Sequence, residues 1–300
     1  MKKIIAVMMA LALAVSFAAC AKQGDGGKAP KTLAGDTSVM AMCFAAPEGY
    51  ETVGRVIDKT ADGVITEKNI VYNFADGAKL TFAYGANLTL SELFDLTDKE
   101  TAEYGGRTFY LTSTGKTMRA FAQEGEDLYC INFDLPDEDS RARYDAVAET
   151  VSFVEEKETQ ENGDDLYAIN WSFDEAWNCV SASSYLEETP DGAVKEKSMT
   201  WRFGADADNV DFRFEIIVYK DAALADQLDD EKQYVEEEIN GVTYSVLAVS
   251  EDEKPYDYYV QQGDDVYRIK NLGVSNGLFS SRSEESDAAF AQFMNGISFS

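Results

Sequence analysis

Apolar and polar residues alternate with a period of two along several stretches of the chain, and these stretches form two sets. Such alternation is typical of strands with one buried face. Asp62-Gly63 and Asn240-Gly241 accept the positive φ of tight hairpins, so we expect antiparallel strands. The alternating apolar residues are Met40, Met42, Phe44, Ile70, Tyr72, Phe74, Leu80, Phe82 and Tyr84 in the first set, and Ile169, Trp171, Phe173, Met199, Trp201, Phe203, Phe212, Phe214 and Ile216 in the second.

A period of 3.6 occurs twice in each set and predicts two amphipathic helices per set. The apolar positions are Leu90, Leu93 and Phe94, matched by Ala222, Ala223, Leu224 and Leu228, and then Tyr144, Val147, Ala148 and Val151, matched by Phe290, Phe293, Met294 and Ile297. Each set therefore has the predicted order β-β-β-β-α-β-β-β-α. We expect an α+β fold of two tandem homologous modules, each a mainly antiparallel sheet with about two packed helices.

The two sets are copies of one sequence module. Residues 58–74 align without a gap on residues 187–203 and share 6 of 17 residues. The spacing between later matches only grows, and the extra residues fall in stretches rich in Gly, Asp and Ser, where loops accept insertions. The later matches are 106–109 with 241–244, 125–131 with 263–269, and 151–153 with 297–299.

The first 20 residues have the layout of a secretory signal peptide. Lys2 and Lys3 precede an apolar stretch over residues 4–15, which is shorter than the roughly 20 residues of a membrane-spanning helix. Residues 17–20, Phe-Ala-Ala-Cys, resemble a bacterial lipobox with Phe17 in place of the usual Leu. The resemblance implies that Cys20 is lipidated and becomes the mature N-terminus.

The signal-peptide layout and the repeat together divide the chain into five segments. We predict a signal peptide over residues 1–19, a lipidated N-terminus and flexible tether over 20–38, module 1 over 39–153, an acidic linker over 154–166 and module 2 over 167–300. The expected location is the cell envelope, outside the cytoplasm and anchored to the membrane by lipid.

Composition excludes several classes of function. The chain has 26 Lys and Arg against 55 Asp and Glu, a net charge of −29, which repels nucleic acid and anionic headgroups. We therefore expect no nucleic-acid partner and membrane contact through the lipid anchor alone. The chain has no His, which excludes Ser-His and Cys-His nucleophile pairs and every zinc site that needs imidazole.

Short motifs in module 1 resemble known α/β modules. They are residues 44–50, Phe-Ala-Ala-Pro-Glu-Gly-Tyr, the strand Asp-Leu-Tyr-Cys-Ile over 127–131, and a closing helix that ends Val151-Ser152-Phe153. They resemble the PsbP-like modules and uncharacterised repeat modules of clostridial lipoproteins, over nearly all of the mature chain. Module 2 departs from the pattern, with Ala176 and Asn178 where the Pro and Gly stood. The resemblance implies an antiparallel sheet with packed helices, a binding or accessory role and no catalytic residues.

The remaining candidate chemistry favours structural explanations. Cys43, Cys130 and Cys179 are an odd number of thiols, so at most one disulfide forms within the chain, and their scatter does not predict a zinc site. The acidic segment 206–211 fails the calcium-loop pattern, because Val210 and Asp211 stand where an oxygen ligand and a Gly are needed. We expect no metal, no cofactor and no catalytic residue.

Exposed aromatic and apolar residues in loops give one candidate binding surface: Trp177, whose counterpart in module 1 is Glu48, with Leu278 and Phe279 in a longer loop. The hypothesis is a lipid-anchored, non-catalytic extracytoplasmic protein that binds a ligand or an envelope protein. Two alternatives stay open, namely an enzyme that uses carboxylates alone on envelope glycans, and a structural spacer.

Overall fold

The computed structural model describes residues 38–93, 95–97, 99–136, 140–158, 161–206, 209–249, 254–275 and 280–300. Cys20, Leu278 and Phe279 lie outside these residues. The chain divides into two compact units, and each is described by itself. Unit 1 comprises Met1–Val56, Thr66–Glu161 and Glu188–Ala193, and unit 2 comprises Ile57–Ile65, Asn162–Glu187 and Val194–Ser300.

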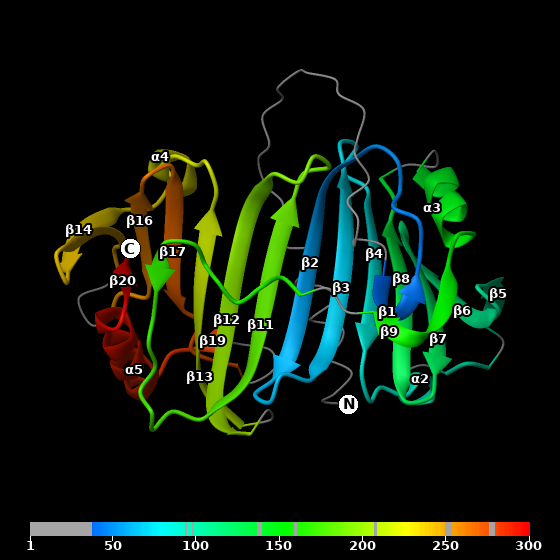
Figure 1. Ribbon diagram of the computed structural model, residues 1–300, viewed down its shortest axis with the longest axis horizontal. Coiled ribbons are helices and arrows are strands. Elements are labelled where there is room, and N and C mark those ends of the chain that lie inside the picture. The colour runs from blue at the N-terminus through cyan, green and yellow to red at the C-terminus, as the bar shows by residue number, and fades with distance from the viewer. Residues whose placement is uncertain are drawn as a thin grey trace. The chain divides into compact units, whose positions relative to one another are not determined.

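Unit 1 is built on an antiparallel sheet with the strand order β2-β3-β4-β8-β7-β6-β5 (Figure 1). The first and last strands of the unit along the chain, β1 (Ser38–Cys43) and β9 (Ser152–Glu158), pair with each other in a separate two-stranded sheet. The helices are α2 (Leu90–Leu93) and α3 (Ser140–Ala148). The other strands are β2 (Tyr50–Thr60), β3 (Ile65–Phe74), β4 (Lys79–Gly85), β5 (Glu100–Tyr104), β6 (Arg107–Thr114), β7 (Thr117–Glu124) and β8 (Asp127–Asp134).

Unit 2 has the equivalent order, β11-β12-β13-β17-β16-β15-β14 (Figure 1). Its strands β10 (Ile169–Asn170) and β20 (Ser298–Phe299), which are far apart in the sequence, also form a separate two-stranded sheet. The helices are α4 (Leu224–Gln227) and α5 (Glu284–Asn295). The other strands are β11 (Cys179–Glu188), β12 (Val194–Asp206), β13 (Asn209–Tyr219), β14 (Tyr234–Ile239), β15 (Val242–Leu247), β16 (Asp257–Gln262), β17 (Asp265–Asn271), β18 (Val274–Ser275) and β19 (Ser280–Ser281).

One glutamine contact occurs in both units in the same form. The side-chain oxygen of Gln123 accepts from the amide of Leu90 at 2.7 Å, and that of Gln261 accepts from Leu224 at 2.8 Å. Each side-chain amide donates to three carbonyls, including Leu88 at 2.9 Å in unit 1 and Ala222 at 3.0 Å in unit 2. Each glutamine thereby ties the single-turn helix to the neighbouring hairpin.

The α+β prediction is wrong, because the described chain is mostly strand. α2 and α4 are single turns of four residues each, and only α3 and α5 are longer, with 9 and 12 residues. Three apolar residues at helical spacing also fit one turn, and a helix this short gains too little to extend itself. Between the short and long helices, unit 1 has four strands instead of the predicted three, and unit 2 has the same four followed by the two-residue strands β18 and β19. Ser152-Phe153 begins β9 instead of ending a helix.

The core of unit 2 is aromatic and lies between the sheet and α5, which packs on β13 and β17. Phe214 is fully buried, and its ring stacks on that of Phe293 at 4.9 Å between centroids and meets that of Phe290 at 5.5 Å. These contacts fix the face of the sheet that points away from solvent. The alternate residues of β12, β13, β16 and β17 therefore point to the opposite face.

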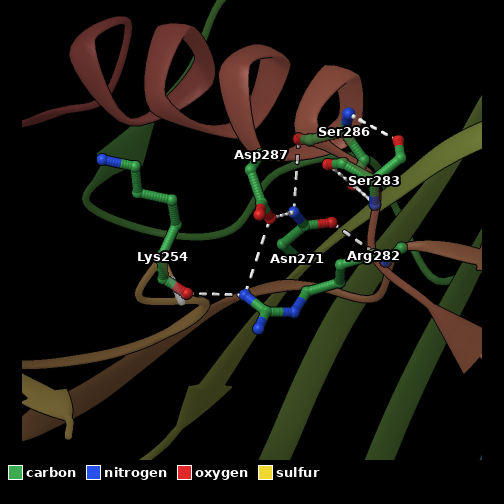
Figure 2. A network of polar contacts seen from close by, with 7 residues as sticks. Lys254, Asn271, Arg282, Ser283, Ser286 and Asp287 are labelled. Atoms are coloured by element: carbon green, nitrogen blue, oxygen red, sulfur yellow. Dashed lines mark hydrogen bonds and ion pairs between the residues drawn. The ribbon is translucent and has the colours of Figure 1, made fainter. Parts of the chain in front are cut away.

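Polar contacts fix the start of α5 (Figure 2). Ser283 and Ser286 form a reciprocal capping box. The Asn271 side-chain amide donates to the Ser286 carbonyl at 3.2 Å and to Asp287 Oδ1 at 3.0 Å, and Arg282 pairs with Asp287 at 3.5 Å. These contacts anchor the start of the helix, and the polar groups involved are hydrogen-bonded to one another.

No helix of the described residues is long and apolar enough to cross a membrane.

Candidate functional site

The candidate site is the face of the unit 2 sheet opposite the aromatic core, which we call the polar face. Its side chains come from five neighbouring strands, and register sets Glu196 opposite Tyr219 and Arg268 opposite Tyr259. Tyrosine and arginine in half-buried positions are typical of binding surfaces. The polar face comprises Tyr185 and Glu187 of β11, Glu196 of β12, Glu215 and Tyr219 of β13, Asp257 and Tyr259 of β16, and Arg268 of β17.

Arg268 organises one side of this face. Its Nε donates to Asp257 Oδ1 at 2.8 Å and its Nη2 to Asp257 Oδ2 at 2.6 Å, while its guanidinium lies 5.0 Å from the centroid of the Tyr259 ring. Burial disfavours the charged form of Arg268, but hydrogen bonding to Asp257 and its charge outweigh burial, and the guanidinium pKa is raised. Two-point pairing and ring stacking hold the guanidinium in one orientation.

Glu196 organises the other side. Its pKa is raised to about 8, first by burial and then by the charges of Glu187 and Glu215, although Arg268 acts in the opposite direction. The neighbouring Tyr185 hydroxyl donates to Glu187 Oε2 at 3.1 Å. Near neutral pH a large share of Glu196 is therefore protonated and can donate a hydrogen bond, which few surface carboxyls do.

This titration predicts that acid stabilises unit 2. Because the folded-state pKa of Glu196 is raised from 4.5 to about 8, the folded state binds its proton more tightly than the unfolded state. The resulting stabilisation is complete below pH 4.5 and is lost as the pH rises through 8. Relative to Glu196→Gln, the wild type should lose on the order of 3 kcal/mol of unfolding free energy across this window.

The measurement is urea unfolding at pH 5 and pH 8.5, followed by tryptophan fluorescence. All three tryptophans, Trp171, Trp177 and Trp201, belong to unit 2, so the signal reports this unit. Glu175→Gln, at an exposed turn of the same unit, is the matched control and should follow the wild type at both pH values. A wild type and Glu196→Gln that differ equally at both pH values would contradict the assignment.

The sequence-predicted surface residue Trp177 lies in the core of unit 2, half-buried. Its indole meets the rings of Phe212 at 5.4 Å, Phe203 at 5.7 Å and Phe214 at 5.8 Å between centroids. Its role there is packing, because three edge-to-face contacts leave little of the ring for a ligand. Leu278 and Phe279 fall outside the described residues, so the structure does not bring the three together.

The cysteines and the acidic turn add no chemistry to the site. No disulfide joins Cys43, Cys130 and Cys179 within the described chain. Burial raises the pKa of the Cys130 thiol to about 12, although Arg119 acts in the opposite direction, so this thiol stays protonated. Around the acidic turn, Asn209 donates to both carboxylate oxygens of Asp206, and no cluster of three metal-ligating side chains occurs in the described part of the chain.

Sequence reasoning missed the polar face, although part of its signal was present. The alternation that marked Met199 and Trp201 as buried also placed Glu196, Ser198 and Thr200 on the opposite face. The alternation does not reveal the strand order, which places β17 beside β13 and β16 beside β17.

Comparison with known proteins places the chain in no family. No family model and no curated protein matches it. Among solved structures, that of MucB in complex with MucA(peri) covers 83% of this chain and 93% of its own, at 8% identity and a TM-score of 0.19. That of the immunity protein TplEi of T6SS from Pseudomonas aeruginosa, complexed with "L" peptide, covers 87% and 95%, at 8% identity and a TM-score of 0.25. These TM-scores are too low to support a conclusion about this chain.

Proposed function

We propose that this chain is a lipid-anchored extracytoplasmic protein without a catalytic role, which binds an envelope protein through the polar face of unit 2. The supporting observation is the polar face itself. Two hydrogen bonds to Asp257 hold Arg268 in one orientation, and the pKa of Glu196 is raised, yet the neighbouring Tyr185, Glu187, Glu215 and Tyr219 stay partly exposed. A surface prepared in this way gives up little side-chain entropy on binding. The signal-peptide layout and Cys20 support the location.

Crosslinking in intact cells, followed by mass spectrometry, tests the proposal. The full-length chain should capture a defined envelope protein. Glu215→Lys reverses a charge in the polar face and should lower the yield of the captured protein about tenfold. Glu175→Lys makes the same charge change at an exposed turn outside the face, and its yield should match the wild type.

Two outcomes would overturn the proposal. If the wild type captures no partner, the protein does not have the proposed binding role. If both variants lose yield equally, binding does not depend on the polar face. Cys20→Ser serves as the anchor control, because without the acylated cysteine the protein should leave the membrane fraction.

A carboxylate-dependent enzyme is the second candidate, favoured by one observation. A half-buried carboxyl with a pKa of about 8 next to two further glutamates is the environment of a general acid. The two candidates separate on Glu196→Gln, which should abolish glycan hydrolysis in an enzyme but leave capture of a protein partner in a binding protein at pH 5, where the wild-type side chain is also neutral.

A further inference from the structure

The outer strand of unit 2, β14, leaves one edge of the sheet open. Among the described strands, β14 pairs with β15 alone and ends the strand order of the unit (Figure 1). An open edge presents backbone amides and carbonyls that can pair with another extended chain. Short length and charge usually protect such edges, so the side chains of β14 decide what can pair there.

The two faces of β14 differ in a way that selects a partner. Glu236 and Glu238 are exposed on one face, opposite the uncharged Ser245 and Thr243 of β15, and no cation of the described chain pairs with either carboxylate. On the other face, the side chain of Val235 is 53% exposed. An added strand therefore meets two carboxylates on one side and an uncovered valine on the other.

Glu237 does not belong to this exposed pair. It alternates onto the core face with Val235, where it accepts a hydrogen bond from the Tyr258 hydroxyl at 3.3 Å. The strand is continuous with the polar face, because the rings of Tyr234 and Tyr259 meet edge to face at 5.8 Å. A partner paired with β14 can thus also contact the polar face.

We infer that β14 is a docking strand for a basic, extended segment of a protein partner, in which cationic and apolar side chains alternate. In an added strand, residues i and i+2 share a face, so two Lys or Arg residues reach Glu236 and Glu238. The apolar residue next to the cation at Glu236, on the side away from Glu238, then lies opposite Val235. A second copy of β14 does not fit, because it would set glutamates against glutamates. The inference rests on the proposed function and names the chemistry of its partner.

The equivalent strand of unit 1 provides a matched control. β5 also ends its strand order, and its Glu100 and Glu103 are exposed, but Thr101 and Ala102 stand where β14 has Glu236 and Glu237, and Glu103 accepts a hydrogen bond from the Thr108 hydroxyl at 2.6 Å. β5 therefore lacks the pair of glutamates at i and i+2. Reversal of its two charges changes the net charge of the protein by the same amount.

The test uses a fluorescent hexapeptide of alternating Lys and Val, titrated into the full-length protein in detergent and followed by anisotropy. Glu236→Lys/Glu238→Lys should weaken binding about tenfold, and Glu100→Lys/Glu103→Lys by less than about twofold. The same peptide with an N-methyl group on every amide cannot donate backbone hydrogen bonds from either edge and should not bind. Amide hydrogen exchange should slow in β14 when the unmodified peptide is present.

Three results would overturn the inference: no binding of the unmodified peptide, equal losses in the two charge-reversal variants, or equal binding of the N-methylated peptide. Near-ultraviolet circular dichroism checks folding, and Glu236→Gln/Glu238→Gln, a milder change, should give an intermediate loss. The same β14 variant in the envelope crosslinking experiment separates the two proposals. If the wild type captures a partner and the β14 variant captures it equally, only the docking strand is wrong; if the wild type captures none, the proposed function is wrong.

Discussion

Phe214→Ala is expected to lower the unfolding free energy of unit 2 by about 3–5 kcal/mol. Phe214 is 0% exposed, and its ring meets those of Phe293, Phe212 and Trp177 at 4.9, 5.2 and 5.8 Å between centroids. Truncation removes the transfer free energy of the ring and leaves a cavity that rigid neighbouring rings cannot fill. Urea unfolding followed by tryptophan fluorescence measures the loss in this unit.

Val235→Ala is the control for Phe214→Ala. Its side chain is 53% exposed on an outer strand, so the change should cost less than about 0.5 kcal/mol. If Phe214→Ala cost no more than Val235→Ala, the aromatic cluster would not be the stabilising core of unit 2.

Strands were predictable from the sequence, but their register was not. The alternating residues of 70–74 and 199–203 lie in β3 and β12, which hold equivalent places in their strand orders. The sequence comparison set Phe82 against Phe214, whereas Ile70 pairs with Phe82 and its counterpart Met199 pairs with Ile216. A slip of two residues keeps every side chain on its face, so a pattern of period two cannot detect it.

Helix content was overestimated for a related reason. Leu90 and Leu93 have helical spacing, but the segment that contains them is held as one turn by the side chain of Gln123, which contacts Leu88 and Leu90. Such a contact joins residues more than thirty positions apart. Local periodicity contains no information about this distant contact. A short run of apolar residues therefore has the same pattern in a single turn as in a longer helix.

The polar face depends even more on distant parts of the chain. Glu196, Tyr219 and Arg268 come from three strands. They meet because β17 pairs with β13, although three other strands separate the two in the sequence. Trp177 shows the same dependence: its place in a connecting segment does not reveal that its indole packs, half-buried, against Phe212 at the border of the core. Loop residues with large apolar side chains need the tertiary structure before they can be assigned to a surface.

Arg268→Met is expected to destabilise unit 2 by about 3–5 kcal/mol, because it leaves Asp257 as a buried charge without its partner. Asp257 is 5% exposed, and both of its carboxylate oxygens accept hydrogen bonds from the Arg268 guanidinium. The loss follows from desolvation: attraction to Arg268 offsets the cost of removing the carboxylate from water, and methionine offers no such attraction.

Two further variants show whether the buried pair, and not lost packing, causes this loss. Asp257→Leu/Arg268→Met removes both charges and should recover most of the stability, since apolar replacements of a buried pair are often tolerated. Lys232→Met breaks the exposed pair with Asp229, whose side chain is 46% exposed, and should cost less than about 0.5 kcal/mol. If the double variant were as unstable as Arg268→Met, the loss would come from packing of the arginine against Tyr259, and the charge pair would not be what orients the polar face.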